Sequence, residues 1–250
     1  MARSVVLAGT VRCEHCMLPP RWCICHALEP VVSPLQVDVL LHFREQWRPT
    51  STGKLIERAV HGARTHIYRR DVPKEREALV EPGRELWILH PRGEPLSGLG
   101  GVLPDPAGIQ VLLLDGSWGE ASRLMRGVER WGRPVCLPLS GPSRYLLREQ
   151  QGEGNHSTIE ALLGLMGALG MAEAEARLRL HFELHVYATL RARGRKAQAT
   201  EYLEASPVRT ALPEILERLH ARRPNDTAVP RKPVGLEGGP AEESEQAPQP

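Results

Sequence analysis

Short apolar runs bounded by turn residues recur along the chain and predict the strands of an α/β protein. The run Val111–Leu114 is apolar throughout, which is typical of a fully buried strand. Further strands are predicted at 35–42, 65–68, 86–90 and 134–139. Pro91 is expected to end the strand that precedes it, because proline cannot donate a backbone hydrogen bond to a sheet.

Apolar residues at helical spacing alternate with these strands. Helices are predicted around 55–60, 121–128, 157–169, 172–190 and 212–220. This alternation favours α/β organisation, in which ligands bind at the carboxyl ends of the strands. Asp115 directly follows the buried strand, where a carboxylate is costly to bury without a partner or a task.

Composition changes this picture little. The 250 residues are 41% hydrophobic, enough for a sizeable core, and the net charge of +2 gives no global argument for nucleic-acid binding. No apolar run is long enough to span a membrane, so we expect a soluble, cytoplasmic protein with no membrane partner. The one compact basic cluster, 191–196, suits either a helix C-terminus or a nucleic-acid contact.

Four cysteines lie close together near the start: Cys13, Cys16, Cys23 and Cys25. In a reducing compartment such thiols favour a tetrahedral, structural Zn²⁺ site, with a redox pair or unligated thiols as the alternative. We therefore divide the chain into a zinc-binding segment (1–33), a catalytic domain (34–221) and a tail (222–250) too poor in apolar residues to fold.

Two polar segments flank the predicted strands. Around 50–54, hydroxyl residues at a helix start, with Arg44 and Lys54 nearby, indicate either a simple capped helix or an anion site. Downstream, Ser157 and Glu160 have the spacing of a capping box at the start of an apolar helix.

Three motifs then occur in a specific order. They are Cys13-x2-Cys16 with Cys23-x-Cys25, then Asp115-Gly116-Ser117-Trp118, then Ser143-x-Tyr145-x2-Arg148 with Ser157-Thr158-x-Glu160. Together, over about 13–190, they resemble the DTW-domain family of tRNA-uridine aminocarboxypropyltransferases. The family has threonine where this chain has Ser117, which keeps the hydroxyl.

The resemblance implies a SPOUT-like sheet with flanking helices and a C-terminal trefoil knot. It also implies transfer of the 3-amino-3-carboxypropyl group of S-adenosylmethionine to N3 of a tRNA uridine, with release of 5′-methylthioadenosine. The partners would be tRNA and S-adenosylmethionine. SPOUT relatives are often dimers, whereas the zinc segment here could replace a partner.

Residue roles follow from the resemblance and from side-chain chemistry. Asp115, Ser117 and Trp118 are the expected catalytic residues, with Asp115 as the base that deprotonates uridine N3. The expected cofactor-binding residues are Leu114, Gly116, Leu137, Pro138, Ser157, Thr158 and Glu160. The expected substrate-binding residues are Arg44, Thr52, Lys54, Ser143, Tyr145 and Arg148. The alternatives are a SPOUT-type methyltransferase and a non-catalytic zinc module that binds RNA.

Overall fold

Five parallel strands form one sheet in the order β2-β1-β4-β3-β5. The computed structural model describes residues 11–70, 72, 75–98, 103–148 and 155–221. The strands are β1 (Gln36–His42), β2 (Arg64–Tyr68), β3 (Glu85–Pro95), β4 (Ile109–Asp115) and β5 (Arg133–Cys136). Every residue of the central strand β4 is buried, which confirms the prediction made from its apolar run.

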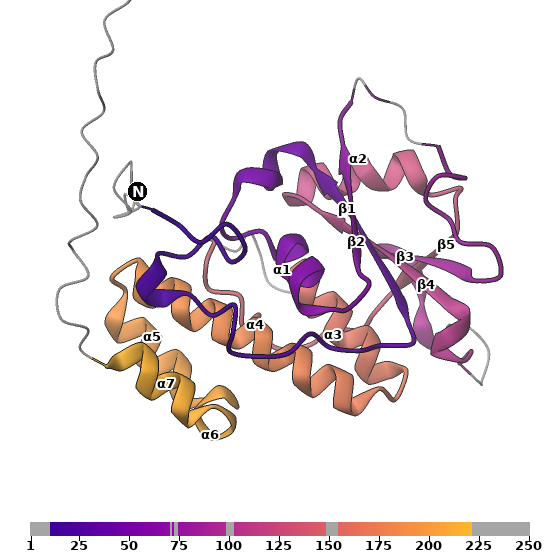
Figure 1. Ribbon diagram of the computed structural model, residues 1–250. Coiled ribbons are helices and arrows are strands. Elements are labelled where there is room, and N and C mark those ends of the chain that lie inside the picture. The colour runs from indigo at the N-terminus through magenta and orange to yellow at the C-terminus, as the bar shows by residue number, and fades with distance from the viewer. Residues whose placement is uncertain (1–10, 71, 73–74, 99–102, 149–154, 222–250) are drawn as a thin grey trace, which may run out of the picture.

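Helices connect and cover these strands (Figure 1). They are α1 (Thr52–Ala59), α2 (Trp118–Val128), α3 (Thr158–Ala168), α4 (Ala172–Ala192), α5 (Lys196–Glu204), α6 (Val208–Ala211) and α7 (Pro213–His220). Short 3-10 turns are η1 (Pro20–Trp22), η2 (Phe43–Trp47), η3 (Leu96–Gly98) and η4 (Pro106–Gly108). The α/β prediction is confirmed, whereas the pattern did not predict α5 and α6.

The sheet separates two apolar layers, because alternate residues of a strand point to opposite faces. Val111 and Leu113 of β4 belong to a large core that also contains residues of α1, α3 and α4. Leu112 and Leu114 belong to a smaller core with residues of α2. Figure 1 shows α2 on one side of the sheet and α1, α3 and α4 on the other.

The prediction that Pro91 ends its strand is wrong, since β3 continues to Pro95. Pairing with β4 stops at Leu89, and the pairing with β5 is irregular between Leu89 and Glu94. Proline is tolerated because it lies in this irregular part, where the ladder is already interrupted. Gly93 allows the close approach, since a Cβ there would lie 2.5 Å from the β5 backbone.

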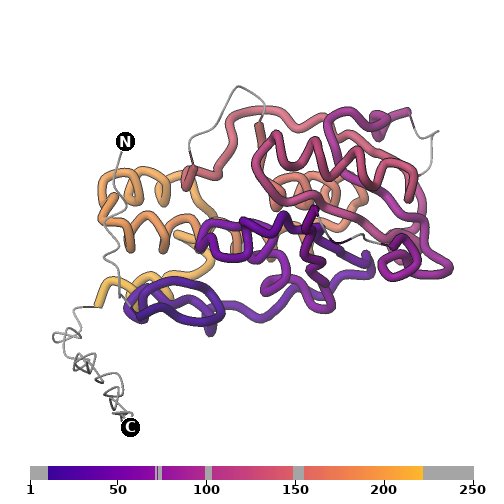
Figure 2. The backbone as a smooth tube through the Cα atoms, turned by 90° about the horizontal axis from the view of Figure 1, so that it is seen from above, coloured from indigo at the N-terminus to yellow at the C-terminus, as the bar shows by residue number. Residues whose placement is uncertain are grey.

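The cysteine-containing segment packs on α4. Trp22 of η1 belongs to the large core, and the guanidinium groups of Arg21 and Arg191 lie 5.3 and 5.1 Å from its ring centroid. Arg193 donates a hydrogen bond to the carbonyl of Leu147. Two cations of the basic cluster therefore have contacts within the chain. Figure 2 shows the segment beside the C-terminal helices.

The boundary after residue 33 stays a prediction, and the predicted tail, 222–250, lies outside the described residues. Within the described ranges, none of the helices combines the length and the apolar character that crossing a bilayer requires.

Candidate active site and metal centre

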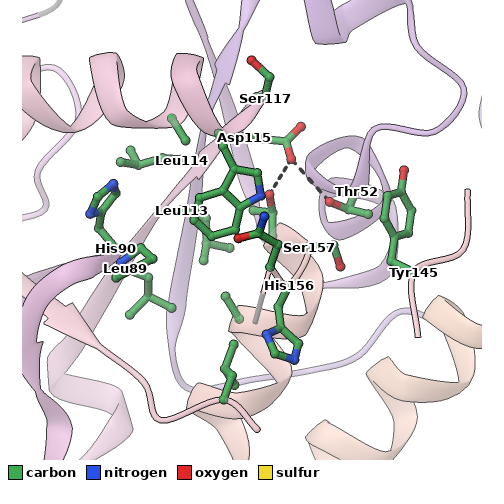
Figure 3. Close-up of a pocket in the computed structure, with 18 of the residues that line it drawn as sticks. Thr52, Leu89, His90, Leu113, Leu114, Asp115, Ser117, Tyr145, His156 and Ser157 are labelled. Carbon is green, nitrogen blue, oxygen red and sulfur yellow. Dashed lines mark hydrogen bonds between the residues drawn. The ribbon is translucent and has the colours of Figure 1, made fainter. Parts of the chain in front are cut away.

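A pocket of about 410 Å³ opens at the carboxyl ends of β4 and β5, beside Leu89–Pro91 in the middle of β3. The starts of α1, α2 and α3 and the loop after β5 complete its wall (Figure 3). This volume is in the range of small-molecule and cofactor sites, and the position is where α/β sheets bind ligands. The structure therefore places the candidate site where the strand pattern predicts it.

Asp115 is the buried acid of this pocket, with 4% of its surface exposed. Three hydroxyls surround its carboxylate. Ser51 donates to Oδ2 at 2.9 Å, Thr158 donates to Oδ1 at 2.6 Å, and Thr52 donates to Oδ1 at 3.4 Å. Figure 3 shows the carboxylate between the helix starts that supply these groups.

Two helix N-termini meet at this carboxylate. Ser51 caps α1 and also accepts the backbone N–H of Lys54, and Thr158 is the first residue of α3. The positive ends of both helix dipoles favour a negative charge here. Gly53 makes the approach possible, since a Cβ there would lie 2.9 Å from Cγ of Asp115. The sequence left a capped helix or an anion site open here; the structure shows the cap, with the chain's own Asp115 carboxylate beside it.

The pKa of Asp115 is raised. Burial is the largest cause, and the hydrogen bonds from Thr158 and Ser51 oppose it only in part. A carboxylate with a raised pKa is a stronger base than an exposed aspartate. Asp115 is therefore a candidate general base on the pocket wall.

Ser117 and Trp118 start α2 at the pocket wall. Ser117 forms a capping box with Glu120, donating its hydroxyl and its backbone N–H to Oε2 at 2.8 Å each. Burial would raise the pKa of Glu120, but these bonds and nearby His42 hold it below the usual range. Trp118 is 40% exposed, so it is a pocket residue and not a core tryptophan.

Arg148 and Tyr145 line the pocket but are already engaged within the chain. Arg148 pairs with Glu45, which is fully buried and also holds Arg48 at 2.6 Å. The Tyr145 hydroxyl donates to the carbonyl of Thr50. Arg48 and Arg148 share the carboxylate of Glu45, and Arg148 also interacts electrostatically with Asp115. These two guanidinium groups are the cations of the pocket wall.

Glu160 ties the loop after β5 to α3. Its carboxylate accepts from Ser143 Oγ at 2.8 Å, from the Arg144 N–H at 2.7 Å and from the Ser157 N–H at 2.7 Å. These bonds confirm the capping box predicted for Ser157 and Glu160. Because both carboxylate oxygens of Glu160 already accept hydrogen bonds, its role in this structure is to hold the loop after β5 against the start of α3.

The other expected site residues divide into two groups. Those on the pocket wall are Thr52, Leu114, Gly116, Leu137, Ser157 and Thr158. Those outside it are Arg44, Lys54, Pro138, Ser143 and Glu160. Arg44 is exposed and stacks on Phe43, whereas the Lys54 amine donates to the carbonyl of Gln46 at 2.9 Å. The binding roles assigned to all these residues stay predictions.

Sequence reasoning missed several groups at the pocket, of which His90 is the clearest. Its Nδ1 accepts the backbone N–H of Arg92 at 3.1 Å, so the neutral ring carries its proton on Nε2. Burial and the charge of Arg92 lower its pKa, which keeps the ring neutral. His90 therefore offers a hydrogen-bond donor at Nε2 on a residue that lines the pocket. Its place at the end of a predicted strand was the available signal.

The four clustered cysteines form a candidate metal centre. Their sulfurs lie within 4.8 Å of one another, with Cys13–Cys25 at 3.5 Å and Cys16–Cys23 at 3.7 Å. Zinc bound tetrahedrally by thiolates at about 2.3 Å places its sulfurs about 3.8 Å apart. The donor set and its spacing therefore fit a closed, structural zinc site, as the cysteine pattern predicts.

Comparison with known families gives one match. A family model described as the DTW domain matches residues 10–190, which include the cysteine cluster and every residue assigned to the pocket. This family is associated with enzymes that modify tRNA. No solved structure matches the chain.

Proposed function

This chain belongs to the DTW-domain family, and on that premise we propose that it is a tRNA-uridine aminocarboxypropyltransferase. The proposed reaction moves the 3-amino-3-carboxypropyl group of S-adenosylmethionine to N3 of a tRNA uridine and releases 5′-methylthioadenosine. The observation that carries the proposal is the buried, hydroxyl-bound carboxylate of Asp115 in the pocket at the sheet edge.

The residues present fit S-adenosylmethionine. Leu89, Leu113 and Leu137 supply apolar wall for a purine, and Arg148 supplies a cation for a carboxylate. The neutral His90 adds a hydrogen-bond donor. When bound, the cofactor supplies an electrophilic carbon next to a sulfonium, whose C–S bond breaks as the new C–N bond forms.

Asp115 has the central chemical role in this proposal. Uridine N3 becomes an effective nucleophile when it loses its proton, and Asp115 takes that proton. The hydroxyls of Ser51 and Thr158 hold the carboxylate in one orientation, so little reorganisation is needed at the moment of transfer. Choice of the aminocarboxypropyl carbon over the methyl carbon is a positioning effect of the pocket walls.

The fold and the cysteine cluster support the pocket in this proposal. The all-parallel sheet with helices on both faces supports a SPOUT-like fold, for which we also propose the C-terminal knot. The cysteine cluster, 13–25, would hold a structural Zn²⁺ on the large core, away from the pocket. Its contribution would be to folding and not to group transfer.

The experiment is incubation of the protein with unmodified tRNA and S-adenosylmethionine, followed by mass spectrometry of the nucleosides. We expect a uridine that carries an aminocarboxypropyl group, together with stoichiometric 5′-methylthioadenosine. A methylated nucleoside would instead identify a methyltransferase. RNA binding that survives in Asp115→Ala, with no product from the wild type, would identify a non-catalytic module.

A further inference from the structure

Three aromatic side chains are exposed in the described part of the chain, and all three lie at the carboxyl edge of the sheet. They are Phe43 at 39% and Trp47 at 78% in η2, and Trp118 at 40% at the start of α2. Exposing a tryptophan to this extent leaves a large apolar surface in water. Trp118 belongs to the pocket, whereas Trp47 has no assigned role.

The turn that carries Trp47 begins beside the pocket. Leu41 of β1 is in register with Asp115 of β4, and η2 starts two residues after Leu41. Arg48, the next residue after Trp47, lines the pocket wall. The exposed face of η2 is therefore continuous with the rim of the pocket.

The turn is fastened from its inner side. Glu45 is fully buried and bridges Arg48 and Arg148. The Lys54 amine donates to the carbonyl of Gln46 at 2.9 Å. These contacts hold the backbone on both sides of Trp47, so its indole is presented on a fixed support.

Positive charge accompanies the aromatic rings. The guanidinium of Arg44 lies 5.6 Å from the ring centroid of Phe43, and the side chain of Arg48 is 46% exposed. Exposed rings next to arginines are the combination that binds unpaired nucleotides, because bases stack on the rings and the cations face the phosphates. A protein partner would also favour tryptophan and arginine, but the continuity with a pocket for a nucleobase favours RNA.

We propose that Phe43, Arg44, Trp47 and Arg48, here named the η2 platform, bind unpaired nucleotides adjacent to the uridine that enters the pocket. One flanking base stacks on Trp47, and Arg44 and Arg48 contact the phosphates on either side. This inference rests on the proposed function, since it takes the RNA that supplies the uridine as the occupant. It explains how the protein would favour a uridine in an unpaired loop.

The test compares Trp47→Ala and Trp47→Phe with the wild type. Binding of a short unpaired RNA and of unmodified tRNA is measured by fluorescence anisotropy, and S-adenosylmethionine binding is measured by calorimetry. Val32→Ala is the matched control, because Val32 is 74% exposed but precedes β1 at the opposite edge of the sheet.

We expect Trp47→Ala to weaken RNA affinity roughly tenfold, the size of one lost base stack. Trp47→Phe should keep most of the affinity, and Val32→Ala all of it. S-adenosylmethionine affinity and the melting temperature should not change, and any transfer activity should show a higher KM for tRNA with the same kcat.

Equal RNA affinity of Trp47→Ala and the wild type would overturn the proposal that the η2 platform binds RNA. An absence of RNA binding by the wild type would also overturn it. An equal loss in Val32→Ala would also overturn it. Because binding is measured without turnover, a wild type that binds RNA through Trp47 but makes no aminocarboxypropyl product would overturn the proposed function and leave the platform standing.

Discussion

Replacing Asp115 by asparagine separates its chemical role from its structural one. Asparagine keeps the shape and an acceptor oxygen, so Thr158 and Thr52 retain a partner for their hydroxyls. The Ser51 hydroxyl can turn and accept from the new amide. The substitution therefore removes the base and the charge while most of the hydrogen bonds remain.

The expected loss of rate is large. A positioned general base contributes about 10²- to 10⁴-fold, so kcat of Asp115→Asn should fall by about that factor. Stability should not fall. Because the folded-state pKa of Asp115 is raised, the ionised carboxylate reduces stability once the pH exceeds the unfolded value of about 3.9, and asparagine removes this cost.

Alanine at the same position should behave differently. It leaves the hydroxyls of Ser51, Thr52 and Thr158 without their acceptor, and each buried unpaired group costs about 1–3 kcal/mol. Because both variants lack the charge, we expect the unfolding free energy of Asp115→Ala to be lower than that of Asp115→Asn by about 3 kcal/mol or more in urea titrations.

The assay is the initial rate of transfer to tRNA at saturating cofactor, measured across pH beside thermal unfolding. The wild-type rate should rise with pH as Asp115 loses its proton, and the midpoint of this rise should lie above the ordinary pKa of aspartate. A wild-type kcat in Asp115→Asn would refute the role of Asp115 as general base. Equal stability of the asparagine and alanine variants would refute the stabilising role of the hydrogen bonds from the three hydroxyls.

Three further predictions concern the cysteine cluster, the buried Asp38 of β1 and the buried Glu45 of η2. Protein purified without chelator should contain one zinc per chain by elemental analysis, and Cys16→Ser should lose the metal and melt at a lower temperature; a folded, metal-free wild type would contradict this. Burial alone would raise the pKa of Asp38, but hydrogen bonds from His66 and Arg64 hold that pKa below its usual range. The ionised carboxylate therefore stabilises the fold above pH about 4, and this stability is lost as the pH falls through the lowered pKa. Melting curves between neutral and acid pH should show this loss in the wild type and a smaller one in Asp38→Asn. Glu45→Gln should cost about 1–3 kcal/mol in urea unfolding, less than a fully buried pair because both guanidinium partners are partly exposed, and no measurable loss would show that the pair is not needed.

The strands, five of the helices (α1 to α4 and α7) and the sheet edge were predictable because each depends on a local pattern. An apolar run produced β4, and the Ser157–Glu160 spacing produced the start of α3. The path of β3 beyond Pro91 was not predictable, since it depends on how Gly93 packs against β5. Short α5 and α6 carry weak periodicity and are fixed by tertiary contacts.

The sequence allowed the acid of the candidate site, Asp115, to be predicted, but not the residues that surround it. Asp115 is conspicuous because a carboxylate follows an apolar run. Its partner Ser51 lies 64 positions away, and the Glu45–Arg148 pair spans 103 positions, so no local spacing signals either contact. Arg148 illustrates the limit, because its residue type suggests ligand binding but gives no sign of its ion pair with Glu45.

The meeting of α1 and α3 on one carboxylate also bears on the order in which the chain is completed during synthesis. Asp115 and Ser51 emerge early, but Thr158 is made 43 residues after Asp115, and α3 must form and dock before the third hydroxyl arrives. A nascent chain that ends before α3 lacks α3 and α4, two of the three helices that cover one face of the central strand. The hydrogen-bonded setting of Asp115 is therefore complete only after α3 has left the ribosome and docked.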